Sequence, residues 1–209
     1  DAKKQMQVLE VYKTHLESGK PARTAPVEDD SKEAIEDAFL LTDKPVLYVC
    51  NVDESALETG NDYTKQIEEI AKSEGAEMLI IAAKLEAEIA ELDDYEERQM
   101  FLEDAGLKEP GVNKLIRSAY KILSLSTYFT VGKKEVRAWT YHDGMKAPEA
   151  AGVIHTDFQK GFIKAEVIKY DDFIDLGSEQ ACKEKGKMNM EGKEYVVEDG
   201  DIMNFKFNV

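Results

Sequence analysis

Residues 51–54, Asn-Val-Asp-Glu, place an amide and two carboxylates directly after an apolar run at residues 46–50. In nucleotide-binding α/β proteins, ligand-binding groups gather where strands give way to loops. The amide of Asn51 offers both a donor and an acceptor, which suits the edge of a purine base. A carboxylate three residues later, at Glu54, can accept a hydrogen bond from an amine or steady the loop. The spacing therefore predicts a loop that contacts a purine.

The side chains around the amide bear on which purine is bound. Guanine-specific GTPases carry Asn-Lys-x-Asp at such a loop, and the acid pairs with guanine N1–H and the 2-amino group. Glu54 in place of Asp, and Val52 in place of Lys, should spoil that fit, and the Val52 backbone could read an adenine edge instead. The alternative is a strand-ending turn that caps the next helix. These residues alone leave both interpretations open.

The elements around this loop follow a strand–helix–strand pattern. Residues 46–50 and 78–83 are apolar throughout, as expected of parallel strands that are buried on both faces. Between them, Asn61 or Asp62 is a candidate N-cap for a helix that ends at Gly75. Ala83 ends the second strand, which puts a second loop beside Asn51. Two strands cannot form a stable parallel sheet alone, so missing sequence or a partner chain must complete it.

Helical patterns flank this unit. Residues 2–18 carry an apolar face, and residues 19–29 are polar with two prolines, which is typical of a linker. Asp30 with Glu33 resembles a capping box. Residues 85–105 predict one acidic helix, and Pro110 opens another.

The periodicity changes after residue 126, where β-branched and aromatic residues predict strands. The predicted elements are a hairpin at 128–142, a short helix from Pro148, a strand at 162–168, a short helix at 178–185, and closing strands at 195–197 and 203–207. This order predicts a small mixed sheet wrapped on a helix, similar to a β-grasp module.

The hairpin carries cations among aromatic side chains, and its candidate contact residues are Lys133, Lys134, Arg137 and Trp139. Such a combination can bind phosphate and stack bases, so it is a candidate contact for RNA or for another partner. The alternative is that half of the aromatic residues lie in the core and that the lysines keep the turn soluble.

The formal net charge of −16 is concentrated in the first part of the chain. Residues 125–209 hold 12 basic and 15 acidic residues, whereas residues 1–124 hold 15 and 28. An acidic surface argues against binding of a phosphate backbone by residues 1–124, because each contact requires a cation. We expect no sequence-specific DNA binding. The longest apolar stretch is far shorter than the ~18 residues of a membrane span, so we expect no membrane association.

The cysteines and histidines do not predict a metal site. Cys50 and Cys182 lie far apart, and neither has a Cys or His neighbour at metal-ligand spacing. Free thiols in a reducing compartment, the cytoplasm, are therefore expected. The chain also has no GxxxxGK[ST] or GxGxxG motif, so nothing in it can cradle a triphosphate or hold Mg²⁺. We assign no catalytic residue.

Five segments carry a resemblance to a known family: PVLYVCNVDE, IAAKLEAEIAELD, EPGVNKLIRSAYKILSLSTYFTVGKKEVRAWT, APEAAGVIHTDFQKGFIKAEVI and EGKEYVVEDGDIMNFKFNV. Through them the chain resembles the YchF family, the Obg-like ATPases of the translation-factor-related GTPase class, over essentially its full length. The last three segments resemble that family's TGS domain, a β-grasp module also found in threonyl-tRNA synthetases and stringent-response enzymes.

The resemblance implies a fold class and a layout. Residues 1–20 would be the returning helix of an inserted coiled coil. Residues 21–124 would be the last part of an α/β P-loop G domain, with a parallel βαβ unit and helices. Residues 125–209 would be an α+β TGS domain. The chain begins at Asp1 rather than Met, and the family's P-loop, Mg²⁺-binding residues, switch regions and catalytic histidine would lie upstream.

The resemblance also implies a function. Family members associate with ribosomes, and their Asn-x-x-Glu motif, linked to a preference for ATP over GTP, maps onto Asn51 and Glu54. Val52 would add a backbone contact, and Ala83 would lie in the second base-side loop. ATP and Mg²⁺ would be cofactors of the intact protein, whereas this part alone should bind nucleotide weakly and be inactive. The alternative function is a non-enzymatic module that contacts the ribosome, RNA or a protein.

Overall fold

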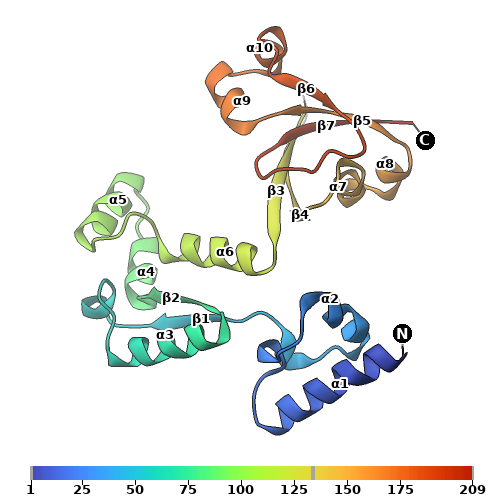
Figure 1. Cartoon of the computed structure of the whole chain (residues 1–209). Coiled ribbons are helices and arrows are strands. Elements are labelled where there is room, and N and C mark those ends of the chain that lie inside the picture. The colour runs from blue at the N-terminus through green and yellow to red at the C-terminus, as the bar shows by residue number, and fades with distance from the viewer. Residues whose placement is uncertain (1, 133–134, 209) are drawn as a thin grey trace. The chain divides into compact units, whose positions relative to one another are not determined.

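The computed structural model describes residues 2–132 and 135–208 and divides into two compact units, Asp1–Ile122 and Leu123–Val209 (Figure 1). Within the described residues, none of the helices combines the length and apolar composition that crossing a membrane requires.

The first unit opens with a small helical cluster. Its elements are α1 (Ala2–Glu17), η1 (Ala22–Thr24), α2 (Asp29–Lys32), η2 (Glu33–Ala38) and η3 (Leu41–Asp43). Residues 19–29, predicted to be a linker, are partly structured. Ala22 and Ala25 of this segment are buried against Val8 and Tyr12 of α1. The predicted capping box at Asp30 is wrong, since the N-cap of α2 is Glu28, which makes no side-chain cap hydrogen bond.

A parallel strand pair forms the centre of this unit. The strands β1 (Leu47–Asn51) and β2 (Glu77–Ile81) run in register, and Asn51 is opposite Ile81. The helix α3 (Asp62–Glu74) joins them. Asn61, not Asp62, caps this helix in a capping box with Thr64, and Gly75 ends it at φ 66°.

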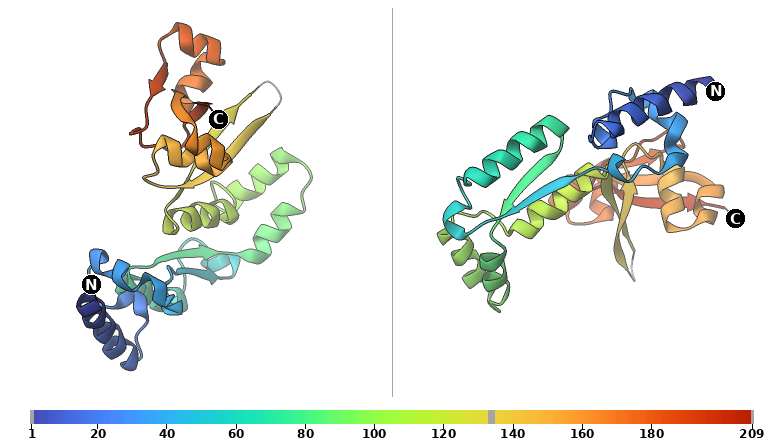
Figure 2. Two further views of the ribbon diagram at one scale, coloured as in Figure 1. Left: turned by 90° about the vertical axis from the view of Figure 1, so that its right-hand side faces the viewer. Right: turned by 90° about the horizontal axis from the view of Figure 1, so that it is seen from below.

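Three helices follow the strand pair, namely α4 (Ala83–Ala90), α5 (Tyr95–Asp104) and α6 (Gly111–Ile122). The single helix predicted at 85–105 is wrong: the chain breaks after α4, and the carboxylate of Asp94 caps α5 by accepting from the N–H groups of Glu96 and Glu97. Ala83 begins a helix instead of ending a strand, because β2 already ends at Ile81. Figure 2 shows α3 and α6 on opposite faces of β1 and β2.

The second unit is a mixed sheet. Its strands are β3 (Leu125–Val131), β4 (Val136–His142), β5 (Phe162–Ile168), β6 (Met188–Glu191) and β7 (Ile202–Phe207). They lie in the order β4-β3-β7-β5-β6, with β3 and β7 parallel and the other pairs antiparallel. The strand predicted at 195–197 is only an isolated bridge between Val196 and Lys146, and β6 went unpredicted.

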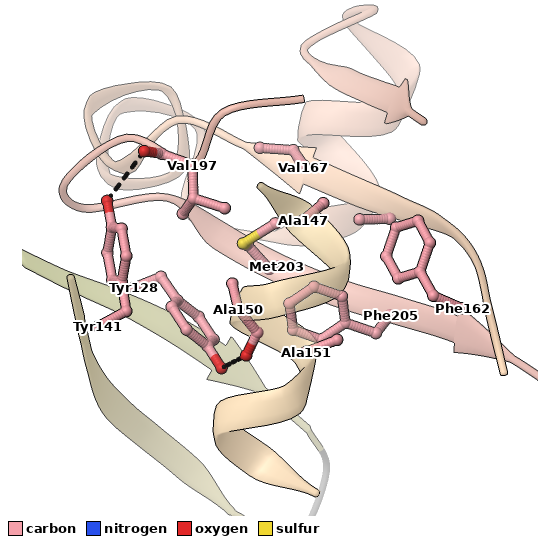
Figure 3. Packing of buried hydrophobic residues seen from close by; sticks show 11 residues of the cluster. Tyr128, Tyr141, Ala147, Ala150, Ala151, Phe162, Val167, Val197, Met203 and Phe205 are labelled. Carbon is pink, nitrogen blue, oxygen red and sulfur yellow. Dashed lines mark hydrogen bonds between the residues drawn. The ribbon is translucent and has the colours of Figure 1, made fainter. Parts of the chain in front are cut away.

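Helices cover both faces of this sheet. They are α7 (Ala147–Ile154), α8 (Thr156–Lys160), α9 (Tyr170–Leu176) and α10 (Glu179–Glu184). Three buried alanines of α7 let it approach the sheet closely, and the Tyr128 hydroxyl donates to the Ala150 carbonyl at 2.9 Å (Figure 3). A second cluster joins Ile168 and Ile202 to Cys182 of α10.

Candidate functional site

The side chain of Asn51 closes the end of the parallel strand pair. Its Oδ1 accepts from the Ala83 N–H at 3.0 Å. That N–H belongs to the first residue of α4, where no helical carbonyl can reach it, and the N-cap of the helix, Ala82, has no side-chain acceptor. Asn51 therefore caps α4. Its Nδ2 group has no partner among the described residues, and the residue is exposed.

Of the two backbone polar groups of Val52, the N–H has a hydrogen-bond partner and the carbonyl has none among the described residues. Its N–H donates to the Ile81 carbonyl at 2.9 Å, which extends the strand pairing by one residue. Within the described chain, no N–H donates to the Val52 carbonyl. The predicted contact of the Val52 backbone with a base can therefore come only from its carbonyl.

A cavity of about 580 Å³ opens at this end of the strands. Its walls come from three loops or helix starts, and its lining residues are Asn51, Val52, Asp53, Glu54, Ser55, Asn61, Ala82, Lys84, Leu85 and Glu88. Glu54 is exposed and begins the short helix η4 (Glu54–Ala56). The structure thus brings Asn51, Val52 and Glu54 to one cavity.

Ala83 contributes differently from its prediction. Its N–H is bound by Asn51, so it cannot also read a ligand, while the neighbouring residues Ala82 and Lys84 line the cavity. Sequence reasoning missed Asn61, which lines the cavity while its Oδ1 caps α3. Its capping-box signal was visible, but nothing in that signal places the residue beside Asn51.

The hairpin residues lie in the second unit. Lys133 and Lys134 fall outside the described residues. Arg137 stacks on Trp139, with its Cζ 4.0 Å from the ring centroid. The Trp139 Nε1–H donates to Thr130 Oγ1 at 2.9 Å, and the ring packs against the core. With one ring face covered by a guanidinium, Trp139 is a poor platform for stacking a base.

The described residues do not include a cluster of metal-ligating side chains. Among the described residues, no group of three or more His, Cys, Asp or Glu side chains is placed to hold an ion. Cys50 and Cys182 are free thiols.

Comparison with known proteins places this geometry in a family. Residues 125–208 match the domain family YchF-GTPase_C, described as a protein of unknown function (DUF933). The ribosome-binding ATPase YchF of Bacillus subtilis (strain 168) is 49% identical over 211 residues, which cover all of this chain and 57% of that protein. The protein of the same name from Escherichia coli O157:H7 is 51% identical over 209 residues, again with 57% of its length covered.

A solved structure extends the similarity to the fold. The Schizosaccharomyces pombe YchF GTPase superposes with a TM-score of 0.86 at 36% identity, over 98% of this chain and 55% of that one. The chain therefore spans somewhat more than half the length of these relatives. Residues 125–208 thus carry the YchF-GTPase_C domain, and the chain is homologous over its full length to the carboxy-terminal part of YchF proteins.

Proposed function

We propose that this chain is the base-recognising and carboxy-terminal part of a ribosome-associated protein that binds and hydrolyses ATP. The observation that carries the proposal is the pairing of a free amide donor, Asn51 Nδ2, with a free acceptor, the Val52 carbonyl, at one cavity. Hydrolysis and Mg²⁺ binding would belong to residues outside this chain, as would the phosphate-binding loop.

The donor and acceptor pattern favours adenine. Along one edge adenine presents N7 as an acceptor and its 6-amino group as a donor, whereas guanine presents two acceptors, N7 and O6. Asn51 Nδ2 would donate to N7, and the Val52 carbonyl would accept from the 6-amino group. Guanine O6 would instead face a carbonyl oxygen. The carboxylate of Glu54, at the same cavity, adds a further acceptor that disfavours guanine O6.

The layout of the proposed protein follows from both units. The first unit, with helices on both faces of a parallel strand pair, would be the last part of a G domain. In the second unit the first and last strands are central and parallel, and α7 lies across the sheet. That order supports a β-grasp module of the TGS type.

The test compares two variants of Asn51 in a full-length protein that carries this chain. Asn51→Asp keeps an oxygen for the Ala83 N–H but removes the Nδ2 donor, whereas Asn51→Ala removes both. Because a hydrogen bond to a base contributes about 1 kcal/mol or more, we expect Asn51→Asp to weaken labelled ATP binding about tenfold with unchanged thermal stability. Unchanged ATP affinity and unchanged preference over GTP would refute the base-reading role.

A second candidate function is a non-enzymatic interaction module in the second unit. The observation that favours it is the exposed Arg137, which follows Lys133 and Lys134 closely in the sequence. Salt-dependent co-sedimentation with ribosomes tests this contact. The charge reversal Lys133→Glu/Lys134→Glu should weaken binding and flatten its salt dependence if the hairpin contacts RNA. If the double variant binds ribosomes as tightly as the unchanged protein and with the same salt dependence, the hairpin is not an RNA contact.

A further inference from the structure

Beside the cavity, a glutamate that does not line it connects two helix starts. Glu86 lies in the first turn of α4, and its Oε1 accepts from the Gly111 N–H at 2.5 Å. Gly111 is buried and is the first residue of α6. A helix N-terminus attracts negative charge, and this carboxylate lies at two of them. The hydrogen bond therefore fastens α4 to α6 across 25 positions of sequence.

A side chain at position 111, the other end of this contact, would displace the Glu86 carboxylate. A Cβ at position 111 would lie 2.5 Å from Glu86 Oε1 and 3.3 Å from Ile81 Cγ2. Both atoms belong to groups that border the candidate site, because Ile81 also accepts from the Val52 N–H. The close approach of α6 to the strand end and to Glu86 thus depends on glycine at this position.

From these contacts we infer that Glu86 is a positioning residue for base recognition, an inference that rests on the function proposed above. The helix α4 is held at its start by Asn51 and, one turn on, by Gly111 through Glu86. This helix and the residue before it supply Ala82, Lys84, Leu85 and Glu88 to the cavity wall. With the Glu86 contact gone, α4 would keep the Asn51 contact and the apolar packing of Leu85 and Ile89 but lose its hydrogen bond to α6, and the cavity wall would shift relative to the Val52 carbonyl.

The first test is a pair of substitutions at Glu86 in the full-length protein, read by binding of labelled ATP and GTP. Glu86→Gln keeps the Oε1 acceptor and should stay within about twofold of the unchanged protein. Glu86→Ala should weaken ATP binding about tenfold, as one lost hydrogen bond would, and should also lower the ratio of ATP to GTP affinity. If Glu86→Ala has the same ATP affinity as Glu86→Gln and the same ratio of ATP to GTP affinity, the inference is overturned.

The second test uses Gly111→Ala, which touches no residue of the cavity wall. Alone it should reproduce the loss seen in Glu86→Ala, since the added Cβ displaces the carboxylate. Residues that share a contact give non-additive effects, so the double variant should bind ATP as weakly as Glu86→Ala and no weaker. If the loss of ATP affinity in the double variant equals the product of the two single losses, Glu86 and Gly111 do not act through a shared contact.

Asn51→Asp separates this inference from the proposed function. If Asn51→Asp changes ATP affinity while Glu86→Ala does not, the positioning role fails and the base-reading role stands. If Asn51→Asp changes nothing, the proposed function fails, whatever the Glu86 variants do. Thermal unfolding followed by circular dichroism identifies a variant that has simply failed to fold. If Glu86→Ala fails in this way, Gly111→Ala carries the comparison with Glu86→Gln.

Discussion

Tyr128 and Tyr141 are buried in the core of the second unit, and each hydroxyl donates to a backbone carbonyl. The acceptors are the carbonyls of Ala150 and Val197, at 2.9 and 3.0 Å. Burial raises the pKa of Tyr141 to about 12 and that of Tyr128 still further, because a phenolate in an apolar core is poorly solvated. These residues therefore couple the stability of this unit to alkaline pH.

We predict that the second unit loses stability as the pH rises above about 10, the ordinary tyrosine pKa. In the unfolded chain both tyrosines ionise near that pH, whereas in the folded unit they stay neutral until the pH reaches their raised pKa values. Their contribution is thus complete below pH 10. That of Tyr141 is lost between about 10 and 12, and that of Tyr128 continues to fall at higher pH. Urea unfolding at pH 8 and pH 11 measures it. The Tyr141→Phe variant should show a smaller loss between the two pH values, and an equal loss would contradict the assignment.

At the residue scale, the sequence predicted which side chains meet but not how each is used. An amide after an apolar run is a local signal, so Asn51, Val52 and Glu54 were predicted and do line one cavity. The hydrogen bond from Ala83 to Asn51 depends on two chain segments that are 32 positions apart. No local pattern reveals that the same amide caps a helix.

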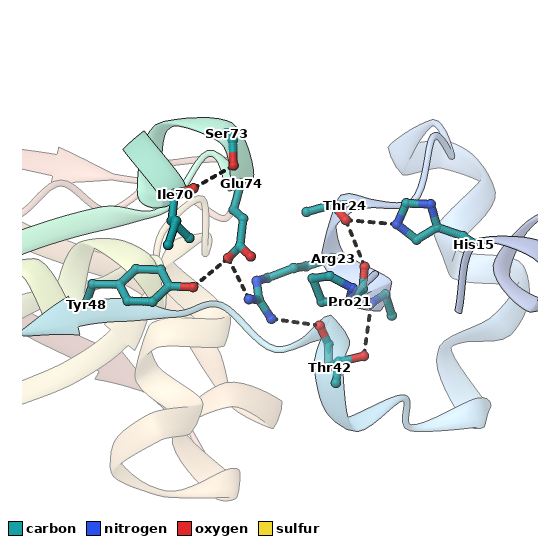
Figure 4. Close-up of polar contacts among 10 residues, drawn as sticks. His15, Pro21, Arg23, Thr24, Thr42, Tyr48, Ile70, Ser73 and Glu74 are labelled. Carbon is teal, nitrogen blue, oxygen red and sulfur yellow. Dashed lines mark hydrogen bonds and ion pairs between the residues drawn. The ribbon is translucent and has the colours of Figure 1, made fainter. Parts of the chain in front are cut away.

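At the element scale, a partly buried ion pair joins the helical cluster of the first unit to its strand pair. Arg23 Nη2 lies 2.6 Å from Glu74 Oε2, and the Tyr48 hydroxyl donates to the same oxygen at 2.8 Å (Figure 4). Hydrogen bonds from Arg23 and Tyr48 hold the pKa of Glu74 below its ordinary value. The segment around η1 is therefore fixed to β1 and α3 at a single carboxylate.

We expect Glu74→Ala to destabilise the first unit by about 1–3 kcal/mol, because it strands a largely buried guanidinium and a hydroxyl. Glu74→Gln keeps one acceptor and should cost less. A lowered pKa means that the Glu74 contribution is present above the pKa of the unfolded carboxyl and is lost as the pH falls through the folded value. Chemical unfolding between pH 7 and pH 3 measures both effects. An exposed carboxylate on the same helix gives the matched control, Glu69→Ala.

The elements that were predicted correctly are those marked by residues close together in the sequence. The strand pair and α3 were predicted because their caps and apolar runs are contiguous in sequence. The break between α4 and α5 was missed, because residues 91–94 have helix-compatible composition and only the cap at Asp94 stops the helix. The short strand β6 was missed because only pairing with β5 defines it.

At the scale of the whole molecule, the two units have cores of different kinds. Eleven buried residues form the main core of the second unit, whereas the clusters of the first unit are smaller and its sheet has only two strands. Small sheets with little buried area are marginal on their own. We therefore expect the first unit to be the less stable one in this chain.

This difference can be measured, because the chain has one tryptophan and it lies in the second unit. Fluorescence of Trp139 reports on that unit alone, whereas far-UV circular dichroism reports on all helices and strands. We predict non-coincident transitions in urea, with the dichroism signal beginning to change at lower urea than the fluorescence. A single shared transition would mean that the units unfold together. Addition of ATP to a full-length protein should move only the earlier transition.

The double use of Asn51 restricts which residues can occupy that position. Aspartate would supply the acceptor for the Ala83 N–H but no donor, serine would not reach both groups, and glutamine would carry its amide one methylene too far from α4. Val52, in contrast, acts through its carbonyl, so many side chains are compatible with the same backbone contact. Two adjacent positions of one loop should therefore differ sharply in the substitutions they accept, and a saturation library of residues 51 and 52 would display that contrast directly.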